Sequence, residues 1–237
     1  MKTLTIILLN LLILSSCSVY IPNGVNTPMF SKKGEAQIGG NVGSGLNLQA
    51  ASAFTDHFAI IANGYFNKST TTVNNDDTRE GNGKLFEAGL GYYNKSKNGM
   101  AFETFVGGGF GNLKIDKNVV STKSNKTFET SATKLFIQPT LGYSTKHFEF
   151  GFTPRWCMLN FAKPKTTYSA AELKSDKFVD LEQTNWMFIE PTFTIRGGGQ
   201  KFKAQLQFGR SFKLNKEDLG YSAGILNLGI VFKFGGK

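Results

Sequence analysis

Few residues of this sequence are of the kinds that usually perform catalysis or bind metals. The 237 residues include only two histidines, His57 and His147. Both fall at expected turns between strands, which is a poor position for a hydrolytic triad. The adjacent carboxylates Asp76 and Asp77 could bind a hard cation, but such a pair in a loop is usually only solvated. Cys157 is expected to be a small buried residue. The sequence therefore predicts no catalytic residue, no metal site and no bound cofactor.

Acidic and basic side chains do recur at alternating positions of the expected strands, where they would share one face. If the strands close into a barrel, this face is the interior, and its charges must pair because an isolated buried charge is costly. Glu149 would then meet Arg196 near one end, and Arg155 would meet Glu190 nearer mid-height. The balanced signs favour a plugged interior, with an ion-selective pore as the alternative. The candidate interior network consists of Glu87, Glu103, Glu149, Arg155, Glu190, Arg196 and Lys203.

The elements that must position these side chains are β-strands, because apolar and polar residues alternate with a period of two along most of the chain. In the C-terminal run, Leu228, Ile230 and Phe232 share one face and Asn227 lies on the other. No helix is expected after Gly34. The pattern predicts an all-β, antiparallel up-and-down barrel of about ten strands, with eight as the alternative. The expected strands are 34–42, 45–54, 57–66, 83–93, 99–116, 135–143, 147–156, 186–196, 200–213 and 225–234.

The connections between these strands alternate in length, as they do in outer-membrane barrels, whose turns are short on one side and long on the other. The one exception is the tight turn around Ser44, which follows the first strand. The parity therefore favours a barrel whose long connections all leave from one end. Long loops are expected at 67–82, 117–128, 161–183 and 214–218, and short turns at 55–57, 94–98, 144–146 and 197–199.

The composition indicates that one face of this sheet lies in lipid. Phe accounts for 22 residues and Gly for 27, while charged residues make up only 19% of the chain. A soluble β-sandwich would also alternate, but it would not need outward faces nearly free of charge. No apolar run of 18 or more residues occurs beyond the N-terminus, so no spanning helix is expected. We therefore expect a transmembrane β-barrel.

The first residues have the features of a bacterial export signal. Met1-Lys2 is a short basic start, and residues 3–14 form an apolar stretch of the length of a secretory signal. Leu14-Ser15-Ser16-Cys17 resembles the lipobox, in which small residues precede a cysteine that receives lipid and becomes the new N-terminus. An ordinary signal peptide cut near Ser16 is the alternative. The expected organisation is a lipoprotein signal peptide at 1–16, a lipidated periplasmic tether at 17–33 and an outer-membrane β-barrel at 34–237.

From Cys17 to Phe234 the chain resembles the small outer-membrane β-barrel proteins of Gram-negative bacteria, with a lipobox added. The resemblance implies an outer-membrane location, both termini in the periplasm, extracellular long loops and contact with outer-membrane lipid. The C-terminal strand, with Ile230, Phe232 and Phe234, resembles the signal read by the outer-membrane assembly machinery. The net charge of +10 does not imply nucleic acid, because the lysines are spread and no basic helix is expected. Lysines that would face lipopolysaccharide phosphates on the outer side are Lys114, Lys117, Lys123 and Lys126.

These features favour a non-enzymatic outer-membrane β-barrel lipoprotein. Its expected role is structural in the envelope, or partner binding through the long outer loops, with the lumen plugged by charge pairs. Two alternatives stay open, a narrow porin-like channel for small solutes and a soluble periplasmic β-barrel lipoprotein that binds a lipid. An outer-membrane enzyme would need a nucleophile or an acid pair at the outer rim, and the sequence offers neither there.

Overall fold

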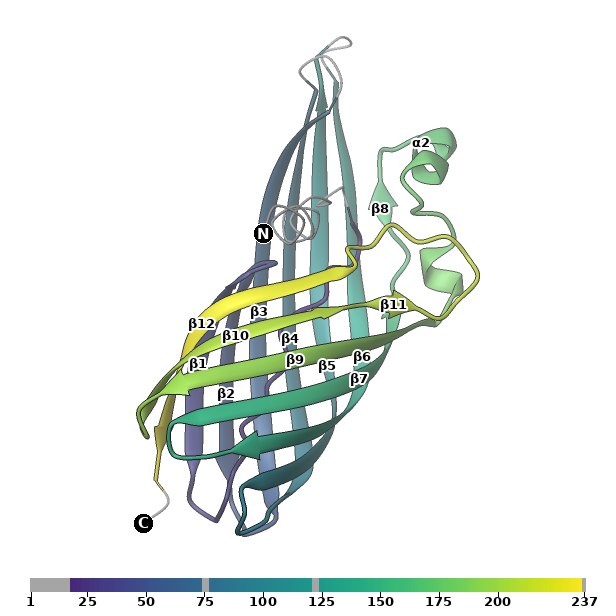
Figure 1. Cartoon of the computed structure of the whole chain (residues 1–237). Coiled ribbons are helices and arrows are strands. Elements are labelled where there is room, and N and C mark those ends of the chain that lie inside the picture. The colour runs from purple at the N-terminus through teal and green to yellow at the C-terminus, as the bar shows by residue number, and fades with distance from the viewer. Residues whose placement is uncertain (1–17, 74–76, 121–123, 236–237) are drawn as a thin grey trace, which may run out of the picture.

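The computed structural model describes residues 18–73, 77–120 and 124–235, which form a closed antiparallel β-barrel (Figure 1). Consecutive wall strands are hydrogen-bonded neighbours, and the last of them pairs with the first to close the sheet. The wall has ten strands, as the alternation predicts, so the eight-stranded alternative is wrong. The wall strands are β1 (Ala36–Gly43), β2 (Leu46–Ala53), β3 (Phe58–Val73), β4 (Asp77–Lys95), β5 (Met100–Val119), β6 (Ser124–Ser144), β7 (Phe148–Phe161), β9 (Trp186–Gly198), β10 (Phe202–Arg210) and β12 (Gly224–Phe234).

Four of these strands continue well beyond the rest of the wall as two long hairpins (Figure 1). β3 pairs with β4 as far as Val73 and Asp77, and β5 pairs with β6 over nearly the full length of both strands. The prediction of loops at 67–82 and 117–128 is therefore wrong, because most of both segments is paired strand. Both faces of these extensions are rich in polar residues, so the sequence there lacks the apolar–polar alternation that marks a half-buried strand.

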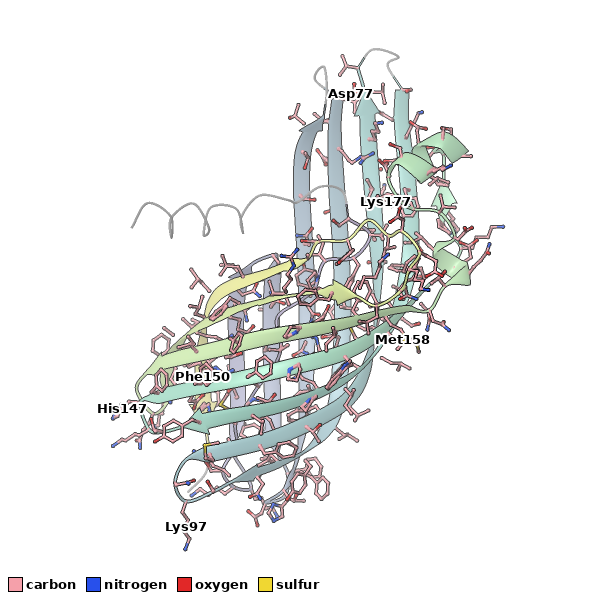
Figure 2. All side chains as sticks on the ribbon, turned by 45° about the vertical axis from the view of Figure 1, so that its right-hand side comes forward. Asp77, Lys97, His147, Phe150, Met158 and Lys177 are labelled. Carbon is pink, nitrogen blue, oxygen red and sulfur yellow. The ribbon has the colours of Figure 1, made fainter. Side chains whose placement is uncertain are left out.

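The two ends of the barrel differ. The turns at 54–57, 96–99, 145–147 and 199–201 gather at one end, which we call the short-turn end. In Figure 2 the labelled side chains of Lys97 and His147 lie at this end, and Asp77 lies at the opposite, long-loop end. β1 rises from the short-turn end, and β12 returns to it at Phe234. The predicted parity of short and long connections is therefore present in the topology.

Side chains alternate between the inside and the outside of the wall on every long strand. On β3, where the sequence alone did not assign faces, Ala59, Ile61 and Asn63 point inward and are buried, while Phe58 and Ile60 are exposed. The inner face is mostly polar or small, and the outer face is mostly apolar. The barrel thus reverses the usual arrangement of a soluble protein over most of its wall.

The connection between β7 and β9 is folded rather than an open loop. It contains the two-residue strand β8 (Lys165–Thr166), which pairs with β6, the helix α2 (Ala170–Ser175) and the 3-10 helix η1 (Leu181–Gln183). The expectation of no helix after Gly34 is wrong here, because Ser169 and Glu172 form a reciprocal capping box that starts α2. The two-residue strand β11 (Phe212–Lys213) pairs with β9.

No helix in the described ranges is both long and apolar enough to cross a membrane.

Candidate functional site

The segment expected to be a tether lies inside the barrel. Residues 18–30, called here the luminal segment, are buried apart from Ile21, which is partly buried. Val19 donates its backbone N–H to Gly220 at the long-loop end, 2.8 Å away. Lys33 donates its backbone N–H to Oδ1 of Asp56 at the short-turn end, 3.0 Å away. The chain therefore crosses the lumen from one end to the other before β1 begins.

This path corrects two expectations. The periplasmic tether is wrong for the described part of 17–33, and Ser18 and Phe234 lie at opposite ends of the barrel rather than on the same side. The sequence does contain a signal, because residues 18–31 carry no charged side chain, unlike a typical solvated linker. The rule that side chains can largely fill a narrow barrel suggested no room for a chain. The interior of this ten-stranded wall instead accommodates one extended segment.

One group of buried charges lies on the wall strands toward the long-loop end of the lumen. The structure brings Arg155 and Glu190 together as expected, with Nη2 and Oε2 2.7 Å apart on directly paired positions of β7 and β9. Lys134 lies 2.9 Å from Oε1 of Glu87. Arg155 also approaches Glu87, at 3.9 Å, so the two pairs form one continuous network.

The luminal segment joins this network through two side chains. The Tyr20 hydroxyl donates to Oε1 of Glu190 at 2.6 Å. Asn23 donates to Oε2 of Glu87 at 2.6 Å, and its side-chain oxygen accepts from Lys134 at 2.9 Å. Buried charges are stable only when both their ion pairs and their remaining hydrogen bonds are satisfied. The segment therefore completes the network, and the charge pairs alone do not fill the lumen.

A second group of charges lies nearer the short-turn end. The other expected pair is also brought together, with Nη1 of Arg196 3.0 Å from Oε2 of Glu149. Lys203 and Lys233 lie 3.2 Å and 2.6 Å from Oε1 of the same carboxylate. Glu149 is thus surrounded by three bases. Glu103 differs from the other acids because it accepts the backbone N–H of Met29, in the luminal segment, at 2.9 Å.

All seven predicted network residues are buried in the lumen, and sequence reasoning left four partners out of the network. Lys134 was missed because β6 begins earlier than expected, and Tyr20 and Asn23 were missed because their segment was taken for a tether. Lys233 carried a usable signal, because the alternation of β12 already places it on the inner face. The missed residues are therefore those on segments whose structure was misassigned, with Lys233 as the exception.

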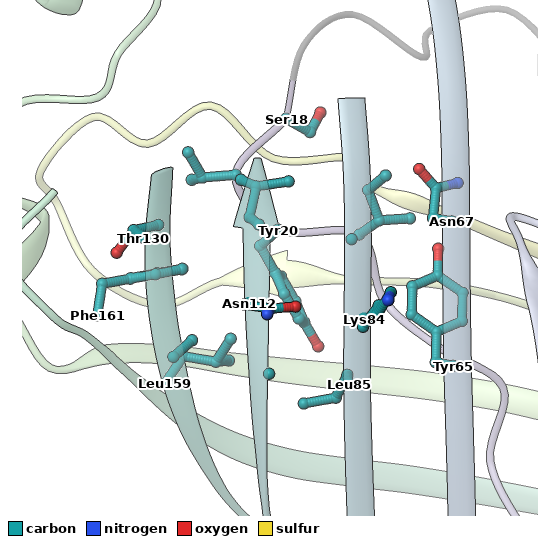
Figure 3. A pocket seen from close by; sticks show the side chains of 16 residues that line it. Ser18, Tyr20, Tyr65, Asn67, Lys84, Leu85, Asn112, Thr130, Leu159 and Phe161 are labelled. Carbon is teal, nitrogen blue, oxygen red and sulfur yellow. The ribbon is translucent and has the colours of Figure 1, made fainter. Parts of the chain in front are cut away.

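A small cavity of about 60 Å³ lies beside the luminal segment near the long-loop end (Figure 3). Its lining includes Tyr20, Leu85, Leu113, Leu159 and Phe161 and is mostly apolar. Pockets that bind metabolites usually enclose about 300–1,000 Å³. This cavity is therefore a packing gap beside the segment and does not have the size of a ligand site.

Among the described residues, the candidates considered for catalysis or metal binding lie apart from one another. Cys157 is buried, with its sulfur 3.8 Å from the Tyr20 hydroxyl, as expected for a small interior residue. His147 contacts the backbone oxygen of Gly198 in the turns at the short-turn end. Across the described ranges no cluster of three or more His, Cys, Asp or Glu side chains could hold a metal ion. Cys17, the signal peptide 1–16, Asp76 and Lys123 lie outside the described residues.

Charges beyond the barrel tie the β7–β9 connection to the long hairpins. Glu172 in α2 lies 2.7 Å from Lys126 and 3.8 Å from Lys117. The hydrogen bond from Lys126 lowers the pKa of Glu172 to about 2, with help from the backbone N–H of Ser169. These two lysines, which were expected to face lipopolysaccharide, thus contact a carboxylate of the same chain. Lys114 likewise lies 3.5 Å from both Asp116 and Glu129.

Comparisons with known proteins find likeness in three-dimensional structure alone. No protein family matches the sequence, and no curated protein matches it. The translocator domain of the autotransporter NalP from Neisseria meningitidis is similar over 86% of this chain and 81% of that domain, with 11% identity and a TM-score of 0.47. A bacterial polysaccharide outer membrane secretin is similar over 88% of this chain and 100% of that one, with 8% identity and a TM-score of 0.26.

These likenesses are too distant to carry function. The class of this protein follows from its own strand pairing, which closes a ten-stranded antiparallel β-barrel with an apolar outer face. The main feature of its interior is the luminal segment, since the chain's own residues occupy the lumen from end to end.

Proposed function

We propose that this protein is a non-enzymatic outer-membrane β-barrel lipoprotein. In this proposal the wall spans the membrane, the luminal segment and its charge network close the lumen, and the long hairpins stand outside the cell. Its role is to support the envelope or to bind a partner through these outer elements. The observation that carries the proposal is the outer face of the wall, which would be unstable in water.

The outward side chains of the wall form an apolar belt. Leu90 on β4, Val106 and Phe110 on β5, Leu141 on β6 and Leu228 on β12 are each about 60% exposed or more. Soluble monomers rarely expose apolar patches beyond a few hundred Å². Lipid is the solvent in which such a belt is stable. This belt disfavours the alternative of a soluble periplasmic barrel that binds a lipid, and the size of the cavity disfavours it further.

The partners in this proposal follow from the same surfaces. The belt contacts outer-membrane lipid, and the C-terminal strand with Ile230, Phe232 and Phe234 on its outer face is the segment offered to the outer-membrane assembly machinery. Lipopolysaccharide remains a candidate at the long-loop end, where Lys114 is about half exposed despite its two carboxylate neighbours. Covalent lipid on Cys17 belongs to the proposal through the lipobox alone.

We expect the protein from extracted outer membranes to run faster on a gel before boiling than after it. A closed barrel keeps its compact shape in cold detergent, because all wall strands are paired and none has a free edge. A version with Cys17→Ser, which cannot be lipidated, should stay in the membrane pellet after carbonate extraction. Unchanged mobility together with release of this variant by carbonate would show that the belt does not lie in lipid.

The path of the luminal segment also supports a proposal for the side of the membrane on which a lipid on Cys17 would lie. Cys17 is bonded to Ser18, which is buried at the long-loop end. Residues 18–30 run through the lumen from the long-loop end toward the short-turn end, so a lipid on Cys17 would be separated from the leaflet at the short-turn end by the whole segment. We therefore propose that the lipid lies on the side of the long loops, in contrast to the periplasmic anchor implied by the resemblance.

We expect an epitope tag inserted between Cys17 and Ser18 to bind antibody on intact cells. A tag after Lys216, in the connection that leads to β12, should do the same. A tag after Lys97, in the turn between β4 and β5, should bind only after the cells are permeabilised. If the N-terminal tag is protected while the Lys216 tag is accessible, the segment does not cross the lumen in the cell.

A further inference from the structure

The wall holds the luminal segment by its main chain. Each carbonyl oxygen from Pro22 to Pro28 accepts a hydrogen bond from a side chain of the wall or its rim, with distances between 2.7 and 3.4 Å. Two backbone N–H groups of the segment, those of Gly24 and Met29, also donate to wall side chains. The side chains that donate to these carbonyl oxygens are Ser44, Gln49, Gln138, Arg155, Arg196, Gln207 and Lys233.

These donors take the place of a neighbouring strand. A buried extended chain must satisfy its carbonyls, and a chain in the middle of a barrel has no strand beside it. The wall supplies amide and guanidinium groups from all sides instead, for example Gln49 on β2, Gln138 on β6 and Gln207 on β10. Every polypeptide carries the same carbonyls, so most of these contacts are independent of the sequence of the occupant.

The wall also has spare hydrogen-bonding capacity. The amide groups of Gln37 and Asn41, both on the inner face of β1, have no hydrogen-bond partner among the described residues, and neither do the side-chain oxygens of Gln49, Gln138 and Gln207. Buried amides are usually satisfied. Free acceptors on the residues that already donate to the segment can take the N–H groups of a chain in another register.

Close packing limits the occupant at one point. A Cβ added at Gly24 would lie 2.7 Å from Oε1 of Gln207 and 3.3 Å from Oδ1 of Asn41. Both atoms are ends of flexible side chains, so a small residue can be admitted by a shift of these amides. The lumen thus restricts the bulk of an occupant locally while recognising its main chain throughout.

We propose that the lumen is a binding site for the main chain of an extended, uncharged polypeptide. The luminal segment is the occupant in this structure, and another polypeptide of similar length can replace it. When the site is empty, the lumen conducts ions. The conduction rests on the proposed membrane barrel, whereas the recognition of the main chain rests on the hydrogen bonds alone.

The first test weakens the contacts without changing the segment. The full-length variant Gln49→Met, Gln138→Met, Gln207→Met keeps side-chain length and removes the donors to Gly24, Val25 and Asn26. Each net hydrogen bond is worth about a fivefold factor in an equilibrium. We expect the open fraction in planar bilayers to rise roughly 100-fold over that of the unmodified protein.

The matched control changes two buried hydroxyls of the inner face that bond one another, Thr140 on β6 and Thr153 on β7, 2.9 Å apart. The variant Thr140→Val, Thr153→Val removes both partners of this bond, keeps side-chain shape and leaves the donors to the segment's carbonyls in place. We expect it to stay closed like the unmodified protein. If the triple variant also stays closed, or if the control opens equally, the main-chain hydrogen bonds are not what holds the segment and the proposal is wrong.

The second test empties the site and refills it. Deletion of residues 19–30, with Ser18 joined to Ser31, should give a steadily conducting barrel. A synthetic peptide of residues 18–31 and a peptide in which Tyr20, Asn23, Asn26 and Thr27 keep their places while the other residues are scrambled should block it at concentrations within about threefold of each other. A block by the natural sequence alone, or by neither peptide, would overturn the proposal. If the deletion variant fails to fold, the triple variant decides.

The gel mobility of every sample before boiling distinguishes a failure of main-chain recognition from a failure of the membrane barrel. A triple variant that keeps the fast-migrating form but gives no conductance difference from the unmodified protein refutes main-chain recognition and leaves the membrane barrel intact. Loss of the fast form in the unmodified protein would instead refute the membrane barrel.

Discussion

The variant Arg155→Met should lower the free energy of unfolding by about 3–5 kcal/mol, the usual effect of removing one partner of a buried ion pair. Arg155 is almost fully buried and lies between two carboxylates, 2.7 Å from Glu190 and 3.9 Å from Glu87. It also donates to the backbone oxygen of Asn23, at 2.8 Å. Its loss leaves Glu190 without its closest base and removes two hydrogen bonds to Asn23 of the luminal segment.

The measurement is chemical unfolding in vesicles, followed by the fraction of the fast-migrating form on a gel. The double variant Arg155→Met, Glu190→Gln should lose less unfolding free energy than the two single variants lose in sum, because the neutral amide no longer needs a base. The exposed pair of Lys177 and Asp218, 3.6 Å apart, supplies the control, and Asp218→Asn should cost less than about 1 kcal/mol. Equal losses for Arg155→Met and Asp218→Asn would mean that the lumen is open to water.

The buried pairs were predictable because strand direction and alternation determine which side chains meet. Once two neighbouring antiparallel strands are aligned, Glu149 and Arg196 fall on one paired position and Arg155 and Glu190 on another. This inference needs only a period of two and a closed barrel. The same reasoning reached ten strands, because the apolar outer face repeats on each of them.

The luminal segment was not predictable by this reasoning because it has no period. Tyr20, Asn23 and Met29 are fixed by partners far away in sequence, such as Glu190, Glu87 and Glu103. A segment rich in Pro, Gly and Asn has the composition of a linker whether it is solvated or held by side chains. Only its lack of charge distinguishes the two cases, and that signal gives no location.

The long hairpins show a related limit. Their strands lie where both faces are polar, so the residues that pair there give no alternation to detect. The helix α2 did carry a local signal in its capping box of Ser169 and Glu172. That signal is short, and its helix buries no residue of its own. Strands within the apolar belt can therefore be predicted from their alternation, whereas elements outside it cannot.

A charge placed in the apolar belt should have the second large effect. Leu228→Arg should lower the free energy of unfolding of a vesicle-bound barrel by about 2–4 kcal/mol. Leu228 lies near the middle of β12, about 61% exposed, between Val42 on β1 and Leu206 on β10. An arginine there would have to lie in hydrocarbon or distort the bilayer. The cost should fall to about 0–1 kcal/mol for Phe234→Arg, at the short-turn end of the same strand, because the effect depends on depth.

The control for this series is an exposed apolar residue outside the wall. Val179, between α2 and η1, is about 41% exposed, and Val179→Arg should leave stability unchanged within roughly 0.5 kcal/mol. The measurement is reversible unfolding in vesicles with guanidinium, compared with the same titration in detergent micelles. If Leu228→Arg and Val179→Arg have equal effects, the outer face of the wall is not in lipid. A graded loss from Leu228 to Phe234 to Val179 would instead place the middle of β12 at the depth of the hydrocarbon.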